Sequence, residues 1–225
     1  MSDMRRAAGP RGMTLALVTA LFGLPGCSLI TMAGKMIMGD PVVSCAFSQQ
    51  THVDLVKDAR TVLVVCKVPE SVKKDFPSLG FDILDGVTRR LKRQGVSIIS
   101  PNEVASWMDD NGGRWDDVGE LADEFDTDYI IDIDIQKFTH TEENSPDLFR
   151  GRAAGMVTAH EVRSSSGLKS THHVFEREFN SEYPSHHPIS VTTISSKTFR
   201  KQYVDRVCSE LSHLFYNHRM SEEVY

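Results

Sequence analysis

A β-branched apolar run extends from Thr61 to Val68. Such a run is typical of a strand that is covered on both faces, so we place it at the centre of a sheet. From Tyr129 to Phe138, apolar and polar residues alternate instead. The alternation predicts a strand with one dry face and one wet face, and it places Asp132 and Asp134 on the wet face.

Apolar residues recur at helical spacing in four other segments. The predicted helices are Leu79 to Gly95, Pro101 to Gly112, Trp115 to Phe125, and Ser195 or Ser196 to Leu214. Ser100, Pro101 and Glu103 form a capping box with proline at the first helical position, which marks the start of the second helix. Four basic residues, Arg89, Arg90, Lys92 and Arg93, crowd the end of the first helix. The helix dipole favours cations there, so we interpret them as a solvated helix end and not as a partner site.

Three strand-like segments complete the pattern, and Ser164 to Gly167 have the composition of a turn between the last two. The three segments are Val96 to Ile99, Arg152 to Val162 and Thr171 to Phe179. The predicted order is therefore β-α-β-α-α-β-β-β-α. We expect an α/β fold with a mixed sheet, in which the first pair of strands is parallel, the last strands form an antiparallel meander, and the helices lie mainly on one face. Residues 59–219 are enough for a single domain with its own core.

A cationic start and a short apolar run open the sequence. Arg5, Arg6 and Arg11 precede the run from Met13 to Leu24, which is too short to span a bilayer. The next residues, Leu24-Pro25-Gly26-Cys27, resemble the lipobox of bacterial lipoproteins. The resemblance implies cleavage between Gly26 and Cys27, and attachment of palmitate and other acyl chains to Cys27.

The alternative is an uncleaved signal anchor that continues across Pro25 and Gly26 to Met38. Lys35 and the Pro-Gly break disfavour it. Residues 1–26 are then the signal peptide, residues 27–58 a membrane tether without sustained periodicity, and residues 220–225 a tail. Two or more acyl chains give stable membrane attachment. By resemblance to enteric sorting, Ser28 after the lipidated cysteine implies an outer-membrane, periplasm-facing location.

The composition excludes two classes of protein. Of the 225 residues, 40% are hydrophobic, which is typical of a globular chain and not of a disordered one. Lys and Arg number 25 against 31 Asp and Glu, and the formal net charge is −6. This balance offers no broad electrostatic footprint for a phosphate backbone, so we expect no nucleic-acid partner.

Besides Cys27, the sequence contains Cys45, Cys66 and Cys208, which allow at most one internal disulfide. Cys66 and Cys208 lie on elements that meet in the expected core. We favour buried free thiols over a disulfide between them. No Cys-x-x-Cys pair is present, so neither a thioredoxin-like motif nor a zinc ribbon is supported.

Asp132 and Asp134 are the first candidates for chemistry, because two carboxylates on one strand face can share a divalent cation. No glycine-rich phosphate loop accompanies them, so we interpret them as an ordinary solvated face. The sequence contains no Gly-x-Ser-x-Gly motif that would mark a nucleophilic serine. A catalytic triad assembled from residues distant in the sequence stays open as an alternative.

The histidines are the second candidates. Neighbours on a strand point to opposite faces, so His172 and His173 cannot bind one ion together. The alternative is a zinc site that takes one ligand from this pair and one from His186-His187. Its third ligand would be His160 or Glu176. No helical His-x-x-x-His pair supports it, and we assign no catalytic, cofactor or metal residue.

The element order, preceded by a lipid anchor, resembles that of one group of periplasmic lipoprotein domains. The local resemblance lies in Leu121-Ala122 and in the segment from Asp128 to Ile135. The group comprises the curli-secretion lipoprotein, the penicillin-binding-protein activator lipoproteins and the amino-terminal domain of TolB. The resemblance implies an assembly or activation module that works by contact.

We therefore expect a non-enzymatic, lipid-anchored protein of the cell envelope that binds another envelope protein. Two alternatives stay open. One is a membrane-tethered hydrolase or transferase that uses Asp132, Asp134 or a histidine, and the other is a homo-oligomeric, ring-forming envelope component. The first of these predicts a concave pocket with shifted titrations around those residues.

Overall fold

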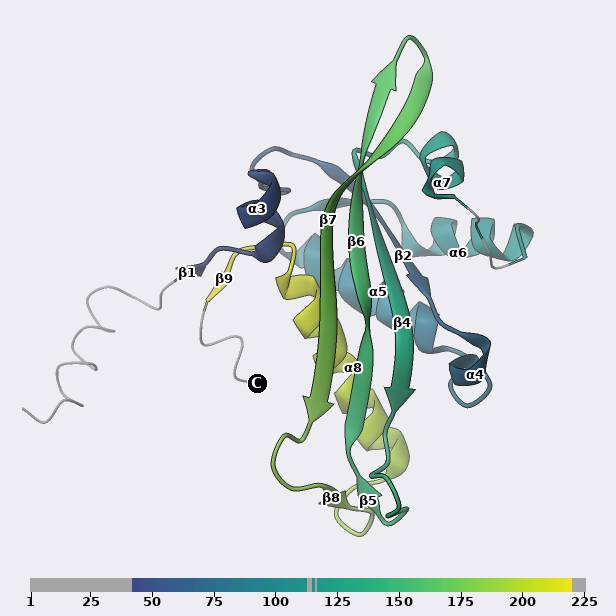
Figure 1. Ribbon diagram of the computed structural model, residues 1–225, viewed down its shortest axis with the longest axis vertical. Coiled ribbons are helices and arrows are strands. Elements are labelled where there is room, and N and C mark those ends of the chain that lie inside the picture. The colour runs from purple at the N-terminus through teal and green to yellow at the C-terminus, as the bar shows by residue number, and fades with distance from the viewer. Residues whose placement is uncertain (1–41, 113–114, 116, 220–225) are drawn as a thin grey trace, which may run out of the picture. The chain divides into compact units, whose positions relative to one another are not determined.

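The structure, a computed structural model, describes residues 42–112, 115 and 117–219. Its centre is a five-stranded mixed sheet in the order β3-β2-β4-β6-β7 (Figure 1). The strands are β2 (Thr61–Lys67), β3 (Ser97–Ile98), β4 (Tyr129–Thr139), β6 (Gly151–Ser165) and β7 (Leu168–Tyr183). β3 and β4 run parallel to β2, whereas β4, β6 and β7 form an antiparallel meander. The expected α/β class with a mixed sheet is confirmed.

The helices and the shorter strands connect and cover this sheet. The helices are α3 (Ala46–Thr51), α4 (Glu70–Lys73), α5 (Leu79–Arg93), α6 (Pro101–Asp110), α7 (Val118–Glu124) and α8 (Ser196–His213). Two small antiparallel pairs join β1 (Val42–Val43) to β9 (His218–Arg219), and β5 (Leu148–Phe149) to β8 (Ile189–Ser190). The sequence analysis did not predict α3, α4 or these short strands.

Helices α5 and α8 pack side by side on one face of the sheet (Figure 1). The two helices approach closely at Gly86, where an added Cβ would lie 2.5 Å from Cys208 Sγ. Val62, Val64 and Cys66 of β2 face this layer and are buried. A glycine in the middle of α5 thus permits the contact, at some cost in helix propensity.

The other face of the sheet is covered at one end by α7. Lys169 of β7 donates hydrogen bonds from Nζ to the carbonyl oxygens of Ala122 at 2.7 Å and Phe125 at 3.1 Å. Leu63 and Ile130, which point to the same side, are fully buried. This face is therefore partly dry, and Asp132 on it is only 9% exposed. The expectation of a wet face was wrong for Asp132, whereas Asp134 is half-buried.

The folded domain begins by residue 42. Phe47 of α3 is 1% exposed, and its ring lies 5.5 Å from that of Tyr129, 5.8 Å from Phe175 and 5.6 Å from Phe215. Cys45 and Leu55 are buried with it. The tether expected over residues 27–58 was therefore wrong for residues 42–58, which belong to the folded domain and contribute Cys45, Phe47 and Leu55 to its core. The rest of that tether, the signal peptide with Gly26 and Cys27, and the tail lie outside the described residues.

The hairpin between β6 and β7 extends beyond the sheet, since β4 pairs no further than Glu161 (Figure 1). Ser166 and Gly167 form its turn with positive φ angles of 54° and 81°. Two consecutive positive φ angles are the geometry of a tight hairpin turn. The turn predicted for Ser164 to Gly167 is confirmed, and both strands are longer than predicted.

We predict that Phe47→Ala lowers the free energy of unfolding by about 3 to 5 kcal/mol, because it leaves a cavity between three aromatic rings. Chemical denaturation of the purified protein measures this. Val56→Ala is the matched control in the same segment. Val56 is 39% exposed, and we expect a change within about 0.5 kcal/mol. Equal stability of Phe47→Ala and the parent would contradict the inclusion of α3 in the core.

Candidate functional site

A groove of about 850 Å³ lies beside the carboxyl end of β2. β3 pairs only with Thr61 and Val62, whereas β4 continues to Lys67. Residues of α4, α5 and α6 therefore line the groove beyond the end of β3. Its apolar wall includes Val68, Phe81, Leu84, Met108 and Trp115. In open α/β sheets, ligands bind outside the carboxyl ends of strands where the connections diverge to opposite faces, as α5 and α7 do here.

Lys67, the last residue of β2, connects the groove to a buried carboxylate on β4. Its Nζ lies 3.0 Å from Asp132 Oδ2 and 4.4 Å from the centroid of the Trp115 ring. Lys67 and Trp115 line the groove, and Asp132 lies behind Lys67. We call these three residues the Lys67 cluster. The alternation of β4 indicated Asp132, but the sequence analysis missed Lys67 and Trp115. The signal for Lys67 was its position as a cation directly after an apolar parallel strand.

The electrostatics of the Lys67 cluster are set by burial. Desolvation raises the pKa of the Asp132 carboxyl, and the hydrogen bond and charge of Lys67 oppose that rise. Among the described residues, neither Asp132 Oδ1 nor Trp115 Nε1 has a hydrogen-bond partner, although both atoms are buried. A buried polar atom without a partner is costly and rare. The cluster therefore contains one buried acceptor, Asp132 Oδ1, and one buried donor, Trp115 Nε1, next to an apolar groove.

The structure brings three of the predicted metal candidates together and separates the others. His160 and His173 face each other across β6 and β7 with ring centroids 5.3 Å apart, and His173 Nε2 lies 3.4 Å from Glu176 Oε2. Burial, and then the charge of His173, lower the pKa of His160. His186 and His187 follow the far end of β7, roughly 30 Å from His173 at the rise of a strand. The zinc site with one histidine from each pair was therefore wrong, and residues 42–112, 115 and 117–219 contain no group of three ligands placed to hold a metal.

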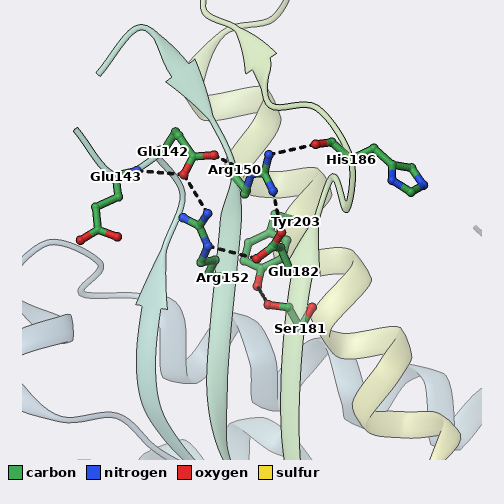
Figure 2. A network of polar contacts seen from close by, with 8 residues as sticks. All are labelled: Glu142, Glu143, Arg150, Arg152, Ser181, Glu182, His186 and Tyr203. Atoms are coloured by element: carbon green, nitrogen blue, oxygen red, sulfur yellow. Dashed lines mark hydrogen bonds and ion pairs between the residues drawn. The ribbon is translucent and has the colours of Figure 1, made fainter. Parts of the chain in front are cut away.

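Four charged side chains form a network at that far end (Figure 2). Glu142 lies 2.6 Å from Arg150 and 2.7 Å from Arg152, while Glu182 lies 2.6 Å and 3.1 Å from the same two residues. Arg150 also donates to the carbonyl oxygen of His186 at 3.1 Å. The hydrogen bond from Arg152 lowers the pKa of Glu142, and that from Arg150 lowers the pKa of Glu182. Because its four charged members pair with one another, this network joins the segment after β4 to the ends of β6 and β7.

The three cysteines of the domain are buried and free. Burial raises the pKa of the Cys66 thiol and raises that of Cys208 to about 12. Thiolates are the nucleophilic and metal-binding form, so both residues are inert at neutral pH. The preference for buried free thiols over a disulfide between Cys66 and Cys208 is confirmed.

We predict that Lys67→Met raises the pKa of Asp132 further, because burial then acts without an opposing cation. A raised folded-state pKa means that the folded protein binds the proton more tightly, so stability falls as pH rises from the ordinary value of 3.8 through the folded-state value. In Lys67→Met this loss of stability continues to higher pH than in the parent. Carboxyl-carbon NMR measures the pKa of Asp132, and urea unfolding at a series of pH values measures the stability.

Lys73→Met is the control for this prediction. Lys73 lines the same groove but pairs with Glu70 at 3.1 Å instead of with Asp132. We expect Lys73→Met to leave the pKa of Asp132 unchanged. An Asp132 titration that is unchanged by Lys67→Met would show that the 3.0 Å contact has no electrostatic effect.

Comparisons with known proteins found structural likenesses only. No family model matches the chain, and no curated protein sequence matches it. The lipoprotein GNA1162 from Neisseria meningitidis is 14% identical with a TM-score of 0.38, and the match covers 68% of this chain and 98% of that one. The PelC dodecamer from Paraburkholderia phytofirmans is 13% identical with a TM-score of 0.36 over 78% and 96% of the two chains. A minor lipoprotein from Acinetobacter baumannii is 7% identical with a TM-score of 0.29 over 72% and 97%. Similarity at this level carries no information on activity or partners.

Proposed function

We propose that this chain is a lipid-anchored protein of the cell envelope that binds a protein partner in the groove beside β2 and acts as an assembly or accessory module. The observation that carries the proposal is the apolar lining of the groove, from which Phe81 projects into solvent. Phe81 is 46% exposed on α5, with Met108 and Trp115 among the other lining residues. Aromatic side chains in a concave site are the usual anchors of protein interfaces.

The polar groups at the floor of the groove give such a partner its orientation. Binding sites combine an apolar lining with a few placed polar groups. Lys67 lines the groove, and its side chain is 40% exposed although Nζ also contacts Asp132. A partner segment that inserts an apolar side chain against Phe81 and accepts a hydrogen bond from Lys67 satisfies both requirements.

The proposed anchor rests on Leu24-Pro25-Gly26-Cys27 and on the cationic, apolar segment before it. No helix within residues 42–112 and 117–219 is both long and apolar enough to cross a bilayer. In this proposal, acyl chains on Cys27 hold the protein at the membrane, and Ser28 supports the outer membrane as its location.

Cys27→Ser provides the test of the anchor. We expect cells that express the full chain to incorporate labelled palmitate into it, and the Cys27→Ser variant to incorporate none. Cys45→Ser is the control, since Cys45 is a buried core residue and carries no lipid in this proposal. Failure of the parent chain to take up label, in cells whose known lipoproteins are labelled, would contradict the proposed location.

A photo-reactive phenylalanine at position 81 tests the groove. We expect irradiation of intact cells to give an adduct of one defined mass with an envelope protein, and Met108→Glu to abolish it. The control carries the same residue at Leu168, which is 78% exposed at the tip of the β6–β7 hairpin, far from the groove. An identical set of adducts at both positions would contradict a specific site, and an adduct of twice the chain's mass would favour the ring-forming alternative.

A tethered hydrolase or transferase is the second candidate, and the Lys67 cluster is the observation that favours it. Asp132 is a buried carboxylate with a raised pKa, and perturbed groups of this kind gather at active sites. Asp132→Asn separates the two candidates. If the chain is an enzyme, Asp132→Asn abolishes its cellular function although the adduct at position 81 still forms. If the chain is a binding module, Asp132→Asn keeps its function as long as that adduct forms.

A further inference from the structure

A second cavity, of about 860 Å³, lies at the carboxyl end of β4. It is lined by the residues that follow α4, by the residues at and after the end of β4, and by the first turns of α8. Its lining includes Lys74, Phe76, His140, Ser196, Lys197 and Arg200. We call it the basic cavity, and it is separate from the groove beside β2, with which it shares no lining residue.

Three cationic side chains gather around the basic cavity. Within the described residues, Lys74, Lys197 and Arg200 make no ion pair, and Asp75 is the one carboxylate among the residues that line it. This concentration of positive charge occurs in a chain whose formal net charge is −6. Like charges that share a concave surface repel one another, and a bound anion removes that repulsion.

The basic cavity also contains neutral hydrogen-bonding groups, His140 and Ser196. The His140 ring packs edge-to-face on Phe76 at 5.3 Å and stacks with Phe149 at 6.1 Å. Its Nε2 lies 2.9 Å from Ser196 Oγ. Burial, and then the charge of Arg200, lower the pKa of His140, so the ring is neutral at pH 7. The cavity thus combines three cationic side chains with the hydroxyl of Ser196 and the aromatic ring of Phe76.

We propose that the basic cavity binds the phosphate group of a small organic phosphate ester, with Lys74, Lys197 and Arg200 as the cationic contacts. Guanidinium and ammonium groups are the usual protein partners of phosphate oxygens. Its volume is that of a site for a small molecule and exceeds the needs of inorganic phosphate, so the Phe76 side of the cavity contacts the organic part. This inference does not depend on the partner proposed for the groove.

Calorimetric titration of the full chain in a non-ionic detergent with glycerol 3-phosphate tests the proposal. We expect Lys197→Glu and Arg200→Glu each to weaken binding about tenfold or more, because each reverses a charge at the phosphate. Lys201→Glu is the matched control. Lys201 is the next residue of α8, is exposed, and does not line the cavity. It makes the same change in net charge, and we expect an effect of about twofold or less at physiological salt.

Proton NMR of His140 supplies a second readout that a loss of folding does not imitate. A bound phosphate stabilises the imidazolium form, so the pKa of His140 rises in the complex. Binding that leaves the His140 titration unchanged would place the phosphate elsewhere and overturn the proposal. Absence of binding at millimolar glycerol 3-phosphate, or an equal loss in Lys201→Glu and Arg200→Glu, would overturn it as well.

Phosphate esters of this class come from two sources, a lipid headgroup or a free metabolite. Titration with dihexanoyl phosphatidic acid, which carries the same phosphate on a short-chain lipid, distinguishes them. Tighter binding of the lipid than of glycerol 3-phosphate, lost in Arg200→Glu, assigns the cavity to a headgroup. Equal or weaker binding of the lipid assigns it to a free phosphate ester.

Discussion

The parallel register of β2 against β4 determines where the polar groups of the candidate site lie. Lys67 ends β2 opposite Asp134, and from there its side chain reaches Asp132, which lies on the same face two residues earlier. A slip of one residue would move Asp132 to the face that α5 and α8 cover, where Lys67 could not follow it. The separate pairing of β2 with the short β3 leaves the last residues of β2 without a strand on that side, which is why helices line the groove. One pairing of β2 thus fixes the ion pair, and the other leaves the opening next to it.

Residues 70–77 lie between the groove and the basic cavity. Glu70, Lys73 and Pro77 line the groove, whereas Lys74 to Phe76 line the basic cavity. Both openings lie toward the carboxyl ends of the parallel strands β2 and β4, although β4 continues to Thr139, beyond the Asp134 that pairs with the last residue of β2. A molecule in either opening therefore contacts the same short segment. The two proposed sites differ in chemistry. The groove wall is largely apolar and its two lysines have carboxylate partners, while the cations of the cavity have none among the residues that the structure describes.

Local pattern was sufficient for the sheet and the long helices, and it failed where exposure depends on distant residues. The alternation of β4 placed Asp132 and Asp134 on one face, but it could not show that Lys169 holds α7 over that face across 47 residues of sequence. Phe47 lies in a segment without periodicity, and its partners Tyr129, Phe175 and Phe215 come from three other parts of the chain. Lys74 of the basic cavity lies more than one hundred residues before Lys197 and Arg200 in the sequence. Spacing along the chain contains no signal for such contacts, because tertiary packing alone creates them.

The early start of the folded domain restricts the proposed partner. If Cys27 carries the lipid, residues 27–41 are all that separate the anchor from β1, and a chain of that length spans at most about 50 Å even when fully extended. A tether that ran to residue 58 would allow about twice that distance. The shorter limit holds whatever conformation the segment adopts, since it follows from bond lengths alone. A partner that binds in the groove must therefore reach the space next to the membrane, which favours another envelope protein over one that stays far from the lipid surface.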